Sequence, residues 1–330
     1  MTQCKKMFPL SIFILISALL GACSDSSSTP KEQYIHAVDG AYTADISNDG
    51  KYSIVSSVHH ELSYWDLEKN ALLYNWGVSQ DSADNLVLAV DIADNNSHVV
   101  TADKETFALW NATSGESEGY WKVRESTIRD IVVANDGRYV LVGKANGVVV
   151  HININNGRRL EFLGHQEKVN TVDMLPNGRI AISGSNDFVA YVWDTQSGQV
   201  IYRFNHTSRV TKVALDAKGK YAFTGDSKKG VHIWNLATGE RISTLDFFNR
   251  QEIFSTVRFS PDGEYLLTGA PNRKVSLWQV ATGKRINTWL VSSRKGSRPP
   301  SAVVYSVAFR DNNHIITESS SGINEVWPIN

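Results

Sequence analysis

Six tryptophans recur along the chain at nearly constant spacing, and this repeat constrains the fold more than any other feature of the sequence. Ile152 occupies the equivalent position in the one gap of double length, and the complete set is Trp65, Trp110, Ile152, Trp193, Trp234, Trp278 and Trp327. The intervals between these positions run from 41 to 49 residues. Such a period is typical of arrays in which each unit is a small sheet that cannot bury both of its faces alone. The spacing therefore predicts seven stacked units.

Two turn signals recur within these units, separated by runs of strand length. The first follows a short apolar run, as in Asn48-Asp49-Gly50, and the second follows most of the tryptophan positions, as in Gln196-Ser197-Gly198. Turns of this kind join antiparallel strands tightly. The runs between them alternate in polarity, as in Val275-Ser276-Leu277-Trp278, and show no long helical period. A length of 330 residues alone would allow two domains, but the repeat favours one all-β array.

The fourth unit carries a set of polar residues that gives the repeat a family resemblance. It contains Gly164-His165, then Ser183, Asp187 and Trp193-Asp194. With this motif and the repeat period, residues 34–330 resemble the WD-repeat β-propeller family. The resemblance implies that His165, Ser183, Asp187 and Trp193 form a buried hydrogen-bonded tetrad that ties the strands of one blade together. That role is architectural rather than catalytic.

Other units carry only part of this motif. The fifth has His206, Thr224 and Trp234, the sixth has Thr268 and Trp278, and the first has only Trp65-Asp66. The position of the tetrad aspartate is Lys228 in the fifth unit and Asn272 in the sixth. Repeats of the family are commonly degenerate, so these departures weaken individual blades more than the assignment of the fold.

The resemblance implies a seven-bladed β-propeller of four-stranded antiparallel blades. The last repeat reaches Asn330 soon after Trp327 and supplies three strands, so we expect residues Tyr34 to Ala37 to add the fourth strand. Pairing of the two ends removes exposed sheet edges and closes the ring. We therefore expect one cooperative domain, in which deletion of either end unfolds far more than one blade.

The first 22 residues have the order of a secretory signal peptide. Lys5 and Lys6 precede an apolar run from Phe8 to Leu20, and small residues follow it. The run is shorter than the ~20 residues that span a bilayer comfortably, which favours a cleaved leader over an uncleaved anchor helix. Removal of the leader would lower the basic count from 33 to 31 against 34 acidic side chains, a formal charge of −3.

Leu20-Gly21-Ala22-Cys23 resembles the lipobox of bacterial lipoproteins, with an ordinary signal and a chance cysteine as the alternative. The resemblance implies cleavage before Cys23, acylation of Cys23, and, because Ser24 follows, transfer to the outer membrane. Several acyl chains together give stable anchoring. Cys4 would be lost with the leader, which leaves no second cysteine for a disulfide. Residues 23–33 then form the lipidated cysteine and a Ser-rich flexible tether.

The sequence offers few features that indicate catalysis. His60-Glu61 begins a metalloprotease-like pattern, but Tyr64 stands where the second histidine is required and the segment resembles a strand. No Gly-rich phosphate loop or nucleophile elbow is present, and His59-His60 would point in opposite directions along a strand. We expect no enzymatic activity and no cofactor.

Three aspartates fall at equivalent positions in the innermost strands of their units. They are Asp45, Asp91 and Asp173, and Arg258 holds the same position in the sixth unit. These positions should approach the central channel, where carboxylates could coordinate a hard cation such as Ca²⁺. The competing interpretation is that they contact channel water and the neighbouring blades, because units one, two and four are not all adjacent.

A set of basic residues falls in connections that should emerge on one face of the ring. These connections join the second and third strands of a blade, or one blade to the next. The set, called the basic arc below, comprises Arg209, Lys228, Lys229, Arg250, Arg273, Lys274, Arg294, Lys295 and Arg298. Fewer acids lie nearby on that face, namely Asp226 and Glu252. Residues 292–301 also form the longest connection between units, and long loops are often functional. A solvated surface with ordinary loop charges is the alternative.

These features lead to one functional hypothesis and one alternative. The hypothesis is a non-enzymatic protein-interaction scaffold, lipid-anchored at the outer membrane and facing the periplasm, with the basic arc as a docking surface for an anionic partner. An assembly factor for outer-membrane proteins is a narrower form of it. A near-neutral pI of about 6.8 argues against general nucleic-acid binding. The alternative is a propeller that binds a metal or small ligand in its channel, with hydrolase activity.

Overall fold

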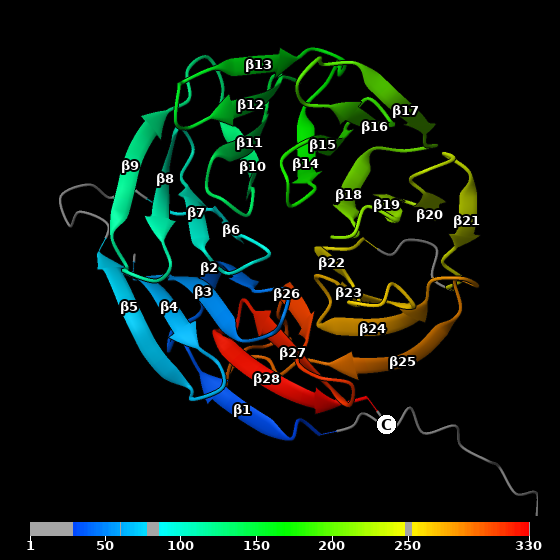
Figure 1. The fold of residues 1–330 in the computed structure, drawn as a ribbon. Helices are drawn as coiled ribbons and strands as arrows, with labels where there is room; N and C mark the ends of the chain where they lie inside the picture. Colours follow the sequence, from blue (N-terminus) through cyan, green and yellow to red (C-terminus); the bar gives the residue numbers. More distant parts are fainter. Residues whose placement is uncertain (1–28, 60, 78–85, 248–252, 330) are drawn as a thin grey trace, which may run out of the picture.

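Seven four-stranded antiparallel sheets are arranged as blades around a central axis (Figure 1). This computed structural model describes residues 29–59, 61–77, 86–247 and 253–329, and all regular structure in those ranges is β-strand. It confirms the predicted all-β, seven-bladed propeller. The leader, Cys23, the first part of the tether, His60, Arg250 and Glu252 lie outside the described residues. No helix in the described ranges is long and apolar enough to cross a membrane.

The first four blades follow one another in chain order. Blade one contains β2 (Ala41–Ile46), β3 (Tyr52–Ser57), β4 (Glu61–Asp66) and β5 (Ala71–Gly77). Blade two contains β6 (Ala89–Ile92), β7 (His98–Ala102), β8 (Thr106–Asn111) and β9 (Ser117–Lys122). Blade three contains β10 (Ile128–Val133), β11 (Tyr139–Lys144), β12 (Val149–Asn153) and β13 (Arg159–Phe162). Blade four contains β14 (Val169–Met174), β15 (Ile180–Ser185), β16 (Val189–Asp194) and β17 (Val200–Asn205).

The last three blades complete the ring. Blade five contains β18 (Val210–Leu215), β19 (Tyr221–Asp226), β20 (Val231–Asn235) and β21 (Arg241–Thr244). Blade six contains β22 (Thr256–Phe259), β23 (Tyr265–Gly269), β24 (Lys274–Gln279) and β25 (Arg285–Leu290). Blade seven contains β26 (Val304–Phe309), β27 (His314–Ser319), β28 (Ile323–Pro328) and β1 (Glu32–Ile35).

Burial differs between the strands of a blade because neighbouring blades cover only part of each sheet. The second strand is buried along nearly its whole length, as in β11 and β27, whereas the outer strand β9 alternates between exposed and half-buried residues. The six repeat tryptophans and Ile152 all lie on the third strand of their blades. The first strand of each blade surrounds the axis (Figure 1).

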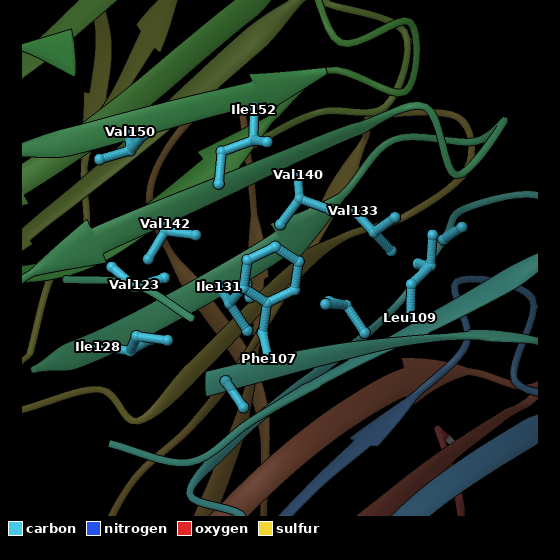
Figure 2. Close-up of a cluster of buried hydrophobic side chains, with 13 residues drawn as sticks. Phe107, Leu109, Val123, Ile128, Ile131, Val133, Val140, Val142, Val150 and Ile152 are labelled. Carbon is cyan, nitrogen blue, oxygen red and sulfur yellow. The ribbon is translucent and has the colours of Figure 1, made fainter. Parts of the chain in front are cut away.

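The hydrophobic core lies between blades rather than inside them. Figure 2 shows the cluster in which Phe107 and Leu109 of blade two face Ile131, Val140 and Ile152 of blade three. All five side chains are at most 3% exposed. Truncation of such a residue to alanine typically costs about 2–5 kcal/mol. Ile152 thus contributes to the core at the position that tryptophan occupies in the other repeats.

The N-terminal strand β1 closes the ring as the outermost strand of blade seven. It pairs antiparallel with β28, and the register runs from Glu32 opposite Val326 to Ile35 opposite Ile323. The strand therefore begins two residues before the predicted segment Tyr34–Ala37. His36 and Ala37 leave the strand because their backbone N–H groups both donate to the carbonyl of Gly322, at 2.9 and 3.0 Å.

A buried polar network joins blade seven to blade one at this closure. The Glu318 carboxylate accepts hydrogen bonds from His36 Nδ1 at 2.6 Å, and from Ser53 and Asn324 at 3.0 Å each. The His36 ring also stacks on Trp65, with ring centroids 4.3 Å apart. Although burial opposes the charged imidazole, the adjacent Glu318 carboxylate raises the pKa of His36 above its ordinary value. The closing strand is thus fixed by side chains as well as by its ladder.

Candidate functional site

The tetrad residues of blade four lie together in a buried cluster. His165 Nδ1 lies 2.9 Å from Asp187 Oδ2, and His165 Nε2 lies 2.9 Å from Ser183 Oγ. These bonds connect the loop before β14 to β15 and to the turn before β16. Trp193 Nε1 is buried and has no hydrogen-bond partner among the described residues. The tryptophan instead stacks on Phe162, with centroids 4.7 Å apart.

Four other blades contain a tryptophan to threonine hydrogen bond between the third and second strands. Trp Nε1 donates to Thr Oγ1 at 2.8–3.3 Å in the pairs Trp110 with Thr101, Trp234 with Thr224, Trp278 with Thr268 and Trp327 with Thr317. The roles of Thr101 and Thr317 were not predicted from the sequence. The signal for them is a threonine nine residues before Trp110 and ten residues before Trp327, as in Thr224 before Trp234 and Thr268 before Trp278.

Blade five obtains its acidic partner from a position that the motif did not indicate. Lys228 occupies the expected aspartate position, but Asp226, at the end of β19, lies 3.6 Å from His206 Nδ1. The other Asp226 oxygen accepts from the backbone N–H groups of Lys228 and Gly230 at 2.8 and 2.9 Å. The carboxylate therefore lies under the turn, and Lys228 is exposed above it.

A cavity of about 580 Å³ occupies the central channel, and the three predicted aspartates line it. Each carboxylate accepts a backbone hydrogen bond from the first strand of the following blade. The pairs are Asp45 with Ile92 at 3.1 Å, Asp91 with Val133 at 2.8 Å and Asp173 with Leu215 at 2.6 Å. The recurring aspartate thus links adjacent blades around the channel.

Two further residues make the same kind of link where the recurring aspartate is absent. Asp130 accepts from Val172 N–H at 3.0 Å, and Ser306 accepts from Ile46 N–H at 3.0 Å. Each lies two residues earlier in its strand than the position that Asp45 marks in blade one. A search confined to one position of the repeat could not find them.

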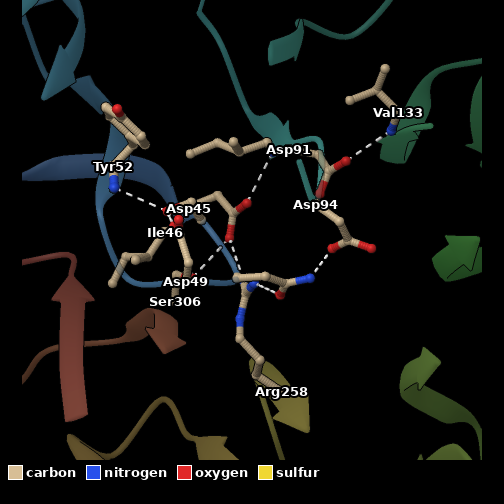
Figure 3. A network of polar contacts seen from close by, with 12 residues as sticks. Asp45, Ile46, Asp49, Tyr52, Asp91, Asp94, Val133, Arg258 and Ser306 are labelled. Carbon is tan, nitrogen blue, oxygen red and sulfur yellow. Dashed lines mark hydrogen bonds and ion pairs between the residues drawn. The ribbon is translucent and has the colours of Figure 1, made fainter. Parts of the chain in front are cut away.

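Arg258 bridges blades across the channel, as Figure 3 shows. Its guanidinium contacts Asp45 Oδ1 at 3.0 Å and also donates to Asn48 Oδ1, while the Asn48 amide donates to Asp94. Ser306 donates to the same Asp45 oxygen at 2.8 Å. Side chains from blades six, seven, one and two are therefore joined in one network.

Burial in the channel wall perturbs several of these carboxyl groups. It raises the pKa of Asp94 to about 6 against the opposing effect of Arg258, and raises the pKa of Asp173 to about 7. Burial, together with the nearby Asp45, also raises the pKa of Asp91. Within the described ranges, no three His, Cys, Asp or Glu side chains are grouped as a metal site requires. Asp45, Asp91 and Asp173 each bind the next blade instead of converging.

The basic arc lies on the face formed by the connections between second and third strands and between blades. Six of its members are exposed, namely Arg209, Lys228, Lys229, Arg294, Lys295 and Arg298. Arg273 and Lys274 are half-buried, and Arg273 Nε donates to the carbonyl of Val291 at 2.7 Å. Arg294 donates to the carbonyl of Asp39. Arg273 and Arg294 therefore also hold the loops in place.

Backbone hydrogen bonds connect neighbouring parts of the arc. Ser227 N–H donates to the Arg209 carbonyl at 3.0 Å, which joins the connection before β18 to the turn that carries Lys228 and Lys229. Arg273 N–H donates to the Ala302 carbonyl at 3.0 Å, which joins the turn before β24 to the long connection 291–303. The cations are thus presented from mutually braced loops.

The seven blades, together with the tetrad and its threonine to tryptophan variants, define a WD-repeat propeller. A family model described as IFT122 second beta-propeller matches residues 45–240, and one described as WD domain, G-beta repeat matches residues 240–279. The chain belongs to the WD-repeat β-propeller family. Propellers of this family are generally non-catalytic and commonly bind protein partners.

A similar protein is the WD repeat-containing protein SL1-17 of Schistosoma mansoni. The two sequences are 25% identical over 148 residues, which is 44% of this chain and 48% of that protein. The match therefore spans about half the length of this relative. It carries no assignment of partner or activity, because a shared fold does not define a function.

Proposed function

We propose that the protein is a non-enzymatic interaction scaffold whose basic arc binds an anionic partner. The observation that carries this proposal is a group of exposed cations on one face of the ring. Lys228, Lys229, Lys295 and Arg298 are exposed, and no ion pair with a described acid is recorded for them. Some turns on the opposite face pair a basic residue with an acid, as in Arg138 with Asp136 at 3.4 Å.

An uncompensated group of cations on one face attracts anionic partners at a distance. Such steering raises association rates and weakens as salt screens the charges, with a Debye length of roughly 8 Å at physiological ionic strength. A protein with an acidic segment fits this surface. The rigid propeller contributes pre-organised loops, which lowers the entropic cost of binding.

We further propose that Cys23 carries the acyl chains that anchor the protein at the outer membrane, with the propeller in the periplasm. The leader of residues 1–22 and the Leu20-Gly21-Ala22-Cys23 motif support this proposal. The tether leads directly into β1, so the anchor would attach at the outer edge of blade seven. A Cys23→Ser variant should move from the membrane to the soluble fraction of cells. Unchanged membrane association would contradict the lipid anchor.

The docking role is tested by reversing charge on one face at a time. A Lys228→Glu, Lys229→Glu variant is compared with Arg158→Glu, Arg159→Glu, which alters an exposed pair where a turn of the opposite face leads into β13. After chemical cross-linking in cells, the first variant should capture much less partner than wild type, and the control should capture as much. Purified complexes should also dissociate as salt rises. Equal capture by both variants at low salt would refute the proposal.

A further inference from the structure

Phe188 is an exposed aromatic residue held in a backbone conformation that disfavours it. It lies in the turn between β15 and β16 with a φ of +69°, and it is 49% exposed. A bulky residue at positive φ is a genuine conformational outlier. Among the described residues, the Phe188 ring stacks on no other ring. Neither core packing nor backbone preference therefore accounts for phenylalanine here.

The equivalent turns of other blades show what the backbone alone favours. Gly147 in blade three and Gly322 in blade seven hold this position, with φ values of +88° and +74°, whereas Arg273 holds it in blade six with a φ of +73°. Glycine adopts such angles without steric cost. A side chain in this conformation is strained, and such strain is concentrated at functional sites. Blade four thus departs from the favoured residue to present an aromatic ring to solvent.

The turn is rigid because Asp187 fixes it from both sides. Asp187 Oδ1 accepts from Val189 N–H at 3.0 Å, and Oδ2 accepts from Gln166 N–H at 3.1 Å and contacts His165 at 2.9 Å. The loop between β13 and β14, which contains His165 and Gln166, also carries Leu163, which is 66% exposed. The tetrad of blade four therefore braces the two loops that expose Leu163 and Phe188.

Phe188 is connected to the basic arc through the backbone. His206 N–H donates to the Phe188 carbonyl at 2.8 Å, and Arg209 follows in the same connection. The Arg209 carbonyl is in turn bonded to Ser227, beside Lys228 and Lys229. The only exposed acid of the loop before β14, among the described residues, is Glu167. One surface therefore presents an aromatic anchor at one end and three cations at the other.

We infer that Phe188 anchors an acidic peptide segment that carries one large apolar side chain. The apolar side chain covers Phe188 and Leu163, and the acidic residues on one side of it follow the connection to Arg209, Lys228 and Lys229. Aromatic residues in rigid settings dominate binding energies at interfaces, and the surrounding charges set orientation. This inference rests on the proposed docking role of the basic arc and specifies the chemistry of the partner.

The test selects ligands from random 12-residue peptides displayed on phage, against the purified full-length chain at low salt. Enriched peptides should combine several Asp or Glu residues with one aromatic or large aliphatic residue. A synthetic copy of the most enriched peptide is then titrated against wild type and Phe188→Gly. Phe188→Gly should weaken binding by about tenfold or more, as loss of an interface anchor does. Because glycine relieves the strain, the variant should melt at or above the wild-type temperature.

Two controls separate this inference from the proposed function. Ile286→Ser removes a 52% exposed apolar residue from the outer strand β25 and should leave peptide binding unchanged. If Lys228→Glu, Lys229→Glu abolishes binding while Phe188→Gly and Phe188→Asn bind as wild type does, the anchor is refuted and the docking role stands. If no peptide is enriched, or if neither set of changes affects binding, both are refuted.

Discussion

Replacement of Thr268 by valine tests whether the threonine to tryptophan bond stabilises a blade. Thr268 and Trp278 are 1% and 0% exposed, and the indole N–H donates to Thr268 Oγ1 at 2.9 Å. Valine has nearly the shape of threonine, so the change leaves no cavity but strands a buried donor. An unsatisfied buried donor costs about 1–3 kcal/mol. We expect a loss of this size in the free energy of unfolding.

Thr224 in blade five makes two such hydrogen bonds, so its replacement can be compared with that of Thr268. Its hydroxyl accepts from Trp234 Nε1 at 2.8 Å and also contacts His206 Nε2 at 2.9 Å. Thr224→Val breaks both bonds, and His206 Nδ1 already lacks a hydrogen-bond partner among the described residues. We therefore expect Thr224→Val to destabilise the protein more than Thr268→Val, by about 2–4 kcal/mol in total.

The assay is denaturation by urea, followed by tryptophan fluorescence and circular dichroism at constant pH. Thr288→Val in blade six serves as the control, because Thr288 Oγ1 is only partly buried and lies 3.4 Å from Ser276 Oγ. The control should change the free energy of unfolding by less than about 0.5 kcal/mol. If Thr268→Val lowers the free energy of unfolding no more than the control does, the threonine to tryptophan bond does not stabilise the blade. A smaller loss for Thr224→Val than for Thr268→Val would contradict it as well.

Two further predictions concern closure of the ring and the channel carboxyl groups. Deletion of residues 29–35 removes β1 and exposes the edge of β28. Calorimetry should therefore show one unfolding transition at a clearly lower temperature than that of the wild type. A separate transition for blade seven alone would contradict cooperative closure. The folded state keeps the proton on Asp173 up to about pH 7, whereas the unfolded chain releases it near its ordinary pKa of 3.8. Since the folded state binds more protons at Asp173 in this window, the contribution of Asp173 to the free energy of unfolding should fall as pH rises from about 4 to 7. Asp173→Asn should make urea unfolding less dependent on pH, and an unaltered dependence would argue against the buried carboxyl.

The periodic features of the chain could be predicted because each repeat imposes the same constraint. The tryptophan spacing and the Asn48-Asp49-Gly50 type of turn predicted the blades, and the structure confirms them together with closure by the N-terminal strand. The predicted closing segment, Tyr34–Ala37, lies two residues after the strand, which runs from Glu32 to Ile35. The bonds of His36 and Ala37 to Gly322, which end the strand, join residues almost 290 positions apart and leave no local pattern.

Features that depend on contacts between blades could not be predicted in the same way. The aspartates of the channel were identified by position, but a single repeat does not show that Asp91 meets the backbone of Val133. Asp226 replaces the expected acid of blade five from outside the motif. Phe188 was overlooked because one apolar residue in a turn is unremarkable until the structure shows its φ and exposure.

Site-directed photo-cross-linking in cells shows directly whether one face of the ring binds an anionic partner. A photoreactive phenylalanine analogue is placed at position 229 in the basic arc, or at position 159, which begins β13 next to a turn of the opposite face. Captured species are identified by mass spectrometry. We expect position 229 to give a specific adduct, lost at high salt, with a protein that carries an acidic segment, and position 159 to give none. Equal capture from both positions, or capture at position 159 alone, would contradict it.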